Sequence, residues 1–146
     1  MVFHPLPMHD DLPAQIDYRI SPVVDNDALN ALFAAAWPGH TPIDFVAQLR
    51  HSLLYVTAHA GPANLAGFVN VAWDGGIHAF LLDTTVHPAW QRRGIGRELV
   101  RQATQGARER GMEWLHVDYE PHLDAFYRSC GFTPTLAGLI RLDGRA

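Results

Sequence analysis

The sequence contains no lysine, and all eleven of its basic residues are arginine. Enzymes that need a Schiff-base lysine or the lysine of a phosphate-binding P-loop are therefore excluded. The single cysteine, Cys130, excludes a disulfide within the chain. No apolar run approaches the roughly 18 residues that a membrane helix needs. These absences lead us to expect a protein of the cytoplasm that does not act at a membrane.

Charged residues are also few, and the net charge is negative, which bears on the partners that the protein can bind. Charged residues make up 18% of the 146 residues, apolar residues make up 48%, and the formal net charge is −4. A nucleic-acid-binding surface needs a basic stripe, so we expect no nucleic-acid partner. The length and apolar content suit one globular domain, which we assign to residues 1–146, with a loose N-terminal arm over residues 1–15.

Histidine is frequent, with nine residues, but its spacing does not favour a metal site. The sequence contains neither a His-x-His nor a His-x-x-x-His pair, which are the spacings that bring two imidazoles together on a strand or a helix. We therefore predict no metal site.

Apolar periodicity and turn residues predict the element order β–α–α–β–β–β–α–β–α–β. The predicted strands are 16–20, 53–58, 65–73, 78–86, 114–119 and 136–142. The predicted helices are 25–37, 42–51, 94–110 and 123–130. Antiparallel hairpins come first and a βαβ crossover follows, so the expected fold class is α/β, a mixed sheet of about six strands with helices on both faces.

A glycine-containing loop, Gln91-Arg92-Arg93-Gly94-Ile95-Gly96, joins the fourth predicted strand to the long helix. Glycine lets a ligand approach the backbone, and the start of a helix offers unpaired N–H groups to an anion such as pyrophosphate. The alternative is that the two glycines only turn a tight corner between strand and helix. On its own, a Gly-x-Gly pattern does not decide between these readings.

Two longer segments carry a more specific signal. LLDTTVHPAWQRRGIGRELV and WLHVDYEPHLDAFYRSCGF, within residues 78–133, resemble the core motifs of the GNAT superfamily of N-acetyltransferases. The resemblance implies the GNAT-like acyl-CoA N-acyltransferase fold. It also implies an enzyme that transfers acetyl from acetyl-CoA, as co-substrate, to a primary amine by direct attack in a ternary complex.

The resemblance also implies roles for individual residues. In the family, the strands that match 78–86 and 114–119 splay apart, and acetyl-CoA lies between them. Tyr127 matches the tyrosine that protonates the departing coenzyme sulfur, although a buried packing role is the alternative. The positions that match the pantetheine and pyrophosphate contacts are Thr84, Thr85, Val86, Arg92, Arg93, Gly94, Ile95, Gly96 and Arg97.

Three side chains are candidates for the general base that removes a proton from the amine. His116 matches a strand position where some relatives carry a glutamate, and a pKa near 6.5 suits a base. Asp83 lies among apolar strand residues, where a carboxylate is costly unless it is used. Glu120 is the third candidate. His116 and Asp83 could each instead be structural, as a satisfied histidine and as a partner of a neighbouring loop.

Some questions stay open at this point. The acceptor could be a protein N-terminus, and the chain could also be a non-catalytic CoA-binding or regulatory module on the same fold. The expected acceptor pocket includes Trp37, His40 and Phe45, with nearby carboxylates that favour a cationic acceptor. Only fifteen residues follow Gly131, so we expect one final strand with an exposed edge and, through it, a homodimer.

Overall fold

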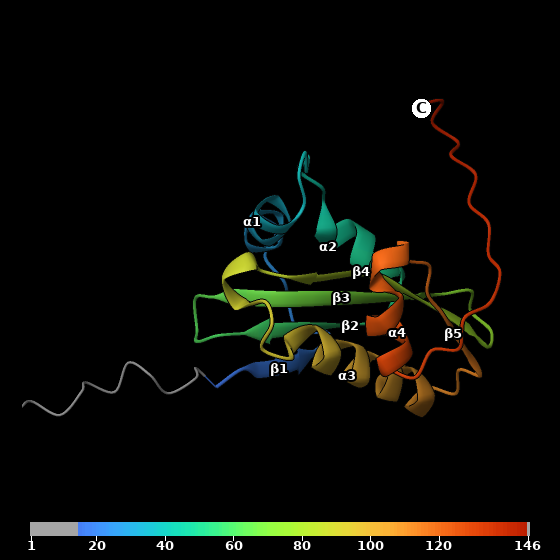
Figure 1. Cartoon of the computed structure of the whole chain (residues 1–146). Helices are drawn as coiled ribbons and strands as arrows, with labels where there is room; N and C mark the ends of the chain where they lie inside the picture. The colour runs from blue at the N-terminus through green and yellow to red at the C-terminus, as the bar shows by residue number, and fades with distance from the viewer. Residues whose placement is uncertain (1–14, 146) are drawn as a thin grey trace, which may run out of the picture.

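The computed structural model describes residues 15–145, which form a five-stranded sheet in the order β1-β2-β3-β4-β5 (Figure 1). The first four strands are antiparallel to their neighbours, and β5 is parallel to β4. The predicted mixed sheet is confirmed, with five strands in place of about six. The strands are β1 (Asp17–Ile20), β2 (Ser52–His59), β3 (Leu65–Trp73), β4 (His78–Val86) and β5 (Trp114–His116).

Helices cover both faces of the sheet (Figure 1). α1 (Asn26–Ala36) and α2 (Phe45–Gln48) lie on one face, and a short 3-10 turn (Leu49–His51) follows α2. α3 (Ile95–Glu109) and α4 (Asp124–Ser129) lie on the other. Two further 3-10 turns, Pro88–Trp90 and Pro121–Leu123, precede α3 and α4. No helix among the described residues is both long and apolar enough to cross a bilayer.

Two apolar cores hold these layers together. The larger core lies between the sheet and α3, where Leu99, Val100 and Ala103 are fully buried against Val56 and Val69. Apolar residues recur along α3 at helical spacing, so one face of the helix packs on the sheet while the arginines remain exposed.

The second core joins α1 and α2 to the opposite face of β3. It is built around three phenylalanines: the ring centroids of Phe33 and Phe45 are 4.8 Å apart, and those of Phe33 and Phe68 are 5.8 Å apart. Phe68 comes from the middle of β3, so this core fixes α1 over the part of the sheet next to β4.

Helix α3 packs directly against the sheet at positions where glycine is required. A Cβ at Gly67 on β3 would lie 2.9 Å from the Leu99 side chain and 3.2 Å from the Thr85 carbonyl oxygen. A Cβ at Gly106 on α3 would lie 2.8 Å from the Leu54 side chain. All three distances are shorter than normal van der Waals contact, so these glycines set the spacing between α3 and the strands.

The second helix begins later than the sequence predicted. Thr41 and Pro42 precede the helix, and Asp44 is its N-cap, with its carboxylate accepting from Ala47 N at 3.1 Å. Ile43 is held outside the helix because the Asn30 side chain bonds both its N–H and its carbonyl, at 2.9 and 2.8 Å. The predicted span 42–51 is therefore a four-residue helix followed by a 3-10 turn.

Two predicted strands differ in the structure. β5 ends at His116, three residues earlier than predicted, where its pairing with β4 stops. The predicted strand 136–142 is not formed, because this segment has no ladder partner in the described chain and its large side chains are exposed. The predicted loose arm, residues 1–15, lies outside the described residues except for Gln15.

The glycine contact between β3 and α3 generates a test. Gly67→Ala should lower the free energy of unfolding by about 1–3 kcal/mol, because the new methyl group overpacks a fixed core. Gly138→Ala is the control, since a Cβ there meets no atom within 4 Å. Urea unfolding of the three proteins measures both effects. Equal stability of Gly67→Ala and the parent would show that α3 is free to move away from the sheet.

Candidate active site

Strands β4 and β5 diverge, and this divergence defines the candidate site. They are paired only at His78↔Trp114, Ala79↔Leu115 and Phe80↔His116 within the described chain. β4 continues to pair with β3 as far as Val86. The last part of β4 therefore turns backbone N–H and C=O groups toward a gap between the strands, where a ligand can bond them.

An extra residue in β4 lies at the point where the strands diverge. Asn70 pairs with Leu82 and Phe68 pairs with Thr85, so three steps along β4 match two along β3. Asp83 is inside this bulge and has a left-handed φ of +59°. Bulges bend a strand and increase its twist, and this one therefore directs the end of β4 away from β5.

The bulge also decides which way the next side chains point. Thr85 faces α1: its hydroxyl accepts from Trp37 Nε1 at 3.0 Å and donates to the Asp83 carbonyl at 2.8 Å. Val86 faces α3, since its Cγ2 is 3.6 Å from where a Cβ of Gly96 would be. The Thr85 side chain thus serves to attach α1 to the bulge.

The Asp83 carboxyl group is in an unusual electrostatic setting. Its side chain reaches solvent, yet the protein atoms around the bulge remove part of its hydration, and this desolvation raises its pKa above the ordinary value of 3.8. A carboxylate with a raised pKa is a stronger base than an ordinary aspartate. Asp83 keeps its candidacy on geometry as well, because it lies in the bulge itself.

The glycine loop leads directly into α3. Gly94 is the N-cap, with φ +79°, and no side chain caps the helix. A Cβ at Gly94 would meet no protein atom within 4 Å, so space does not require glycine at this position. The left-handed backbone conformation does. The first-turn N–H groups and the positive end of the helix dipole consequently face outward beside the gap.

Arginines surround this helix start. Arg97 donates to the Ser129 carbonyl at 3.1 Å and so joins α3 to α4. The guanidinium of Arg93 lies 4.9 Å from the centre of the Trp90 ring. Arg92 is exposed and has a left-handed φ of +62°. Arg92 and Arg93 are thus in the loop before the helix, and Arg97 is in the first turn of α3.

A groove of about 400 Å³ continues from Gly94 between α3 and α4. Arg101 and Arg108 line it, and the sequence analysis did not single them out. Spacings of four and seven residues from Arg97 to Arg101 and from Arg101 to Arg108 place all three on one helix face, which is the signal that could have found them.

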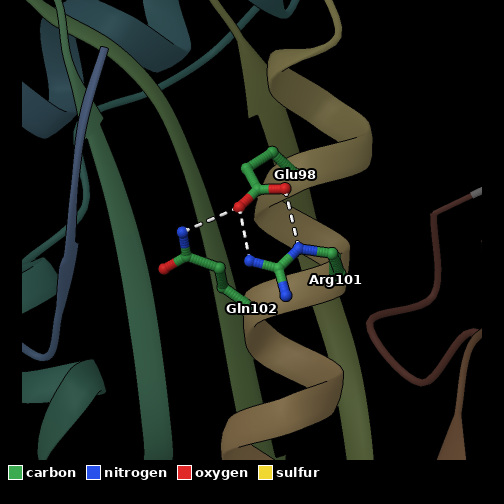
Figure 2. Close-up of polar contacts among 3 residues, drawn as sticks. All are labelled: Glu98, Arg101 and Gln102. Atoms are coloured by element: carbon green, nitrogen blue, oxygen red, sulfur yellow. Dashed lines mark hydrogen bonds and ion pairs between the residues drawn. The ribbon is translucent and has the colours of Figure 1, made fainter.

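Glu98 restrains one of these arginines (Figure 2). Its carboxylate accepts from Arg101 Nε and Nη2 at 2.8 and 2.7 Å, and from Gln102 Nε2 at 3.0 Å. The hydrogen bond from Arg101 is the main reason that the pKa of Glu98 falls to about 2. Glu98 is therefore charged at neutral pH and holds Arg101 along the helix.

Tyr127 lies on the α3 side of the gap and is 7% exposed. Its ring stacks on Tyr119, with centroids 4.8 Å apart, and meets Phe126 and Phe132 edge-on. Burial raises the pKa of the phenol above 10, and the neighbouring Thr84 side chain lowers it by less. The phenol therefore stays protonated at neutral pH, next to the β4 segment that borders the gap.

His116 lies on the opposite face of the sheet from Tyr127. The alternation along β5 puts Leu115 in the core with α3 and turns His116 toward the α1 side. There its Nε2 is 2.7 Å from His78 Nδ1, and its ring stacks on Phe80 with centroids 4.9 Å apart. The partnership with His78 was missed, because the two residues are 38 positions apart in the sequence.

The other residues considered in the sequence analysis differ in how far they are buried. Phe45 is buried in the core and does not line a pocket, whereas Trp37 is 48% exposed beside the bulge. Burial raises the pKa of Cys130, as expected for an unreactive thiol. Glu120 is exposed just before α4. Within residues 15–145, no three histidine, cysteine or acidic side chains converge as metal ligands would.

Comparison with known proteins connects this geometry to a family. A family model described as the Acetyltransferase (GNAT) family matches residues 26–132. Among curated proteins, the uncharacterized N-acetyltransferase ycf52 of Porphyra purpurea is 28% identical over 87 residues, which cover 58% of this chain and 50% of that protein. The chain spans about half the length or less of the first curated relatives that it matches.

Solved structures agree with the sequence match. A GNAT family acetyltransferase from Streptococcus pneumoniae superposes with a TM-score of 0.71 and 28% identity, covering 90% of this chain and 100% of that one. An aminoglycoside N-acetyltransferase solved with CoA gives a TM-score of 0.72 at 17% identity, covering 92% and 99%. At that identity the second likeness concerns the fold alone.

The raised pKa of Asp83 predicts a pH-dependent effect on stability. A folded-state pKa above the unfolded value destabilises the native state increasingly as pH rises from about 3.8 through the folded pKa. Asp83→Asn removes this penalty, and asparagine also tolerates a positive φ. The variant should therefore unfold at a higher temperature than the parent at pH 7. The difference between the two unfolding temperatures should become smaller below pH 4. A variant less stable than the parent at pH 7 would contradict this assignment.

Proposed function

This chain belongs to the GNAT family of acetyltransferases, and from that premise we propose that it transfers acetyl from acetyl-CoA to a primary amine. One observation supports the proposal most: the gap between β4 and β5 opens beside the uncapped start of α3. A strand edge with free backbone groups and a helix start that attracts anions lie side by side. Together they suit a ligand that carries an amide-rich arm on a pyrophosphate.

We assign the coenzyme contacts residue by residue. The backbone of Thr84, Thr85 and Val86 borders the gap and would bond the pantetheine arm. The pyrophosphate would lie on the α3 start, where Gly94 keeps the backbone accessible. The arginine-lined groove between α3 and α4 would take the rest of the nucleotide. The loop residues that complete this cradle are Arg92, Arg93, Ile95, Gly96 and Arg97.

Acetyl-CoA supplies the activated carbonyl, and residues on the two sheet faces then act on opposite sides of it. His116, on the α1 side, or Asp83, in the bulge, takes a proton from the ammonium group, directly or through water. The freed amine attacks the carbonyl carbon, so that a C–N bond forms and the carbonyl oxygen becomes an oxyanion. Collapse of this tetrahedral species breaks the C–S bond, the nitrogen releases its second proton to solvent to give the neutral amide, and the acid that protonates the sulfur takes up a proton from solvent. A backbone N–H at the β4 bulge can hold the oxyanion that develops.

Tyr127 would act on the α3 side as the acid. Its buried phenol keeps its proton at neutral pH, because burial raises its pKa. It can donate that proton to the departing sulfur, which leaves CoA as a neutral thiol. Attack from one face and departure on the other need no covalent intermediate with the enzyme.

The same proposal extends to the acceptor, the domain organisation, the location and the oligomeric state. Exposed carboxylates such as Asp118 and Glu120 near the gap favour a cationic acceptor. We further propose that residues 1–146 form one domain, that the chain acts in the cytoplasm and that it forms a homodimer. A protein N-terminus is a second acceptor class, favoured by the open α1 face around His116.

A panel of amines and peptides tests the activity itself. Each acceptor is incubated with acetyl-CoA, and release of the CoA thiol is followed together with the mass of the product. We expect thiol release with at least one amine class, accompanied by a gain of one acetyl group. Tight binding of acetyl-CoA without turnover across the panel would instead support a non-catalytic CoA-binding module.

The helix start should decide coenzyme binding. Gly94→Val places a branched side chain where the pyrophosphate is expected, so calorimetric affinity for acetyl-CoA should fall at least roughly tenfold. The parent should gain roughly 2.7 kcal/mol of stability at a hundred times its dissociation constant, and the variant should not. Gly75→Val is the matched control: Gly75 has φ +81° in a turn remote from the loop. Equal binding by Gly94→Val and Gly75→Val would refute the loop assignment.

Tyr127→Phe tests the acid. The variant keeps the ring and its stacking, so the KM for acetyl-CoA should stay nearly constant while kcat falls by about 10²–10⁴-fold. Tyr119→Phe is the control, since the Tyr119 hydroxyl donates to Asp124 at 2.8 Å and has no part in the proposed proton transfer, so its kcat should stay within about twofold. If Tyr127→Phe had the kcat of the wild type, Tyr127 would be a packing residue and not the acid.

A further inference from the structure

Two histidines from neighbouring strands meet on the α1 side of the sheet. His78 begins β4, and His116 is the last residue of β5 that pairs with β4. The centroids of their rings are 5.0 Å apart, and His78 Nδ1 is 2.7 Å from His116 Nε2. At this distance one nitrogen donates a hydrogen bond to the other, so the two side chains form a single unit.

Phe80 holds the ring of His116 from a second side. The two residues are cross-strand neighbours, and their rings stack with centroids 4.9 Å apart and planes 20° apart. His116 is exposed, and ordering an exposed side chain costs conformational entropy, which the contacts with Phe80 and His78 offset. An ordered imidazole therefore lies at the last paired position before β4 and β5 diverge.

The hydrogen bond determines which nitrogen of His116 is free. A neutral imidazole has one N–H donor and one lone-pair acceptor. If His116 donates through Nε2, its Nδ1 keeps the lone pair, and His78 carries its own hydrogen on Nε2. The reverse direction needs the hydrogen on Nδ1 of both rings, whereas Nε2–H is the more stable form of a free neutral histidine side chain. The first arrangement gives both rings the more stable form.

The free nitrogen is also available to a ligand. Within residues 15–145, no hydrogen bond uses His116 Nδ1. The bond to His78 and the stacking on Phe80 occupy the other nitrogen and one face of the ring. Nδ1 is thus the atom of His116 that can accept a proton from outside the protein.

We propose that His78 is a positioning residue for the transfer reaction: it holds His116 in the Nε2–H form, with Nδ1 free to take the proton from the acceptor amine. This inference rests on the proposed function, and it selects His116 over Asp83 as the base. His78 acts only through His116 and does not contact the substrate. A catalytic imidazole is commonly oriented in this way, through the ring nitrogen that does not react.

Proton transfer leaves the pair intact. An N–H bond of the acceptor ammonium group breaks, the proton binds to His116 Nδ1, and the electron pair stays on the amine nitrogen that attacks the carbonyl carbon. The imidazolium still donates through Nε2 to neutral His78, now as a charge-assisted hydrogen bond. No hydrogen bond of the pair has to break during the step, and His116 becomes neutral again by releasing the proton to solvent.

Nuclear magnetic resonance of the histidine ring nitrogens tests the pair without turnover. In ¹⁵N-labelled protein at mildly alkaline pH, protonated and lone-pair ring nitrogens resonate in separate regions. The signals of His116 are assigned by their loss in His116→Gln. We expect a protonated Nε2 and a lone-pair Nδ1 on His116. A protonated Nδ1 on His116 in the parent would overturn the proposal.

Two substitutions of His78 provide matched readouts in the same spectra. Asparagine has an acceptor, Oδ1, as many bonds from Cα as the Nδ1 of histidine, so His78→Asn should keep the pattern of the parent. Phenylalanine keeps a ring but has no acceptor, so His78→Phe should move both nitrogen signals of His116 toward intermediate values. Unchanged signals in His78→Phe would show that His78 does not fix the form of His116.

Kinetics with an acceptor from the amine panel provides the second test. His116→Gln should lower kcat by the factor of about 10²–10⁴ that a general base supplies. His78→Phe should lower kcat by about tenfold or more while the KM for acetyl-CoA stays nearly constant, and His78→Asn should recover most of that loss. His51→Phe is the control: His51 is exposed just before β2, which β3 separates from β4, so its kcat should stay within about twofold.

A double variant separates positioning from a purely structural role. If His78 acts only through His116, His78→Phe should change kcat by less than about twofold in a chain that already carries His116→Gln. A full tenfold loss in that chain, or the kcat of the parent in His78→Phe, would refute the positioning role. The kcat of the parent in His116→Gln would also refute it and would assign the base to Asp83. If no amine in the panel is acetylated, the proposed function fails, and the resonance spectra alone decide whether His78 fixes the form of His116.

Discussion

The single extra residue in β4 is the constraint on which the candidate site depends. With Asp83 in a left-handed conformation, β4 stays paired to β3 as far as Val86 but leaves β5 after Phe80. If β4 and β5 had continued as a regular parallel pair, their backbone groups would satisfy one another and no ligand could insert between them. The bulge therefore leaves the edge of β4 that faces β5 without backbone partners, so that a ligand can bind there.

The packing on each face keeps this arrangement in place. Gly67 lets α3 approach the sheet closely, so the start of α3 is held beside the gap. On the other face, the hydrogen bond from Trp37 to Thr85 attaches the end of α1 to the bulge. Tyr127 and His116 are consequently fixed on opposite faces, with the gap as the route between them. That separation suits a reaction in which an acid and a base act on opposite sides of one carbonyl.

Local sequence patterns predicted most of the fold, and they failed where tertiary pairing decides. β3 and β4 were predicted to the residue, because alternation and the Asp74-Gly75-Gly76 turn determine them locally. The bulge at Asp83 was not foreseen, since it is a property of register between strands. The partnership of His78 with His116 likewise depends on strand pairing, in this case of β4 with β5. The segment 136–142 reads as a strand, but a strand forms only where a neighbour completes its hydrogen bonds.

Hydrogen exchange with and without acetyl-CoA tests the central claim most directly. If the coenzyme occupies the gap, amides of residues 83–86 on β4 and 94–97 at the start of α3 should gain protection together. Amides in β2, which is remote from the gap, should not change. Protection spread evenly over the sheet, or confined to a surface away from both segments, would contradict the account.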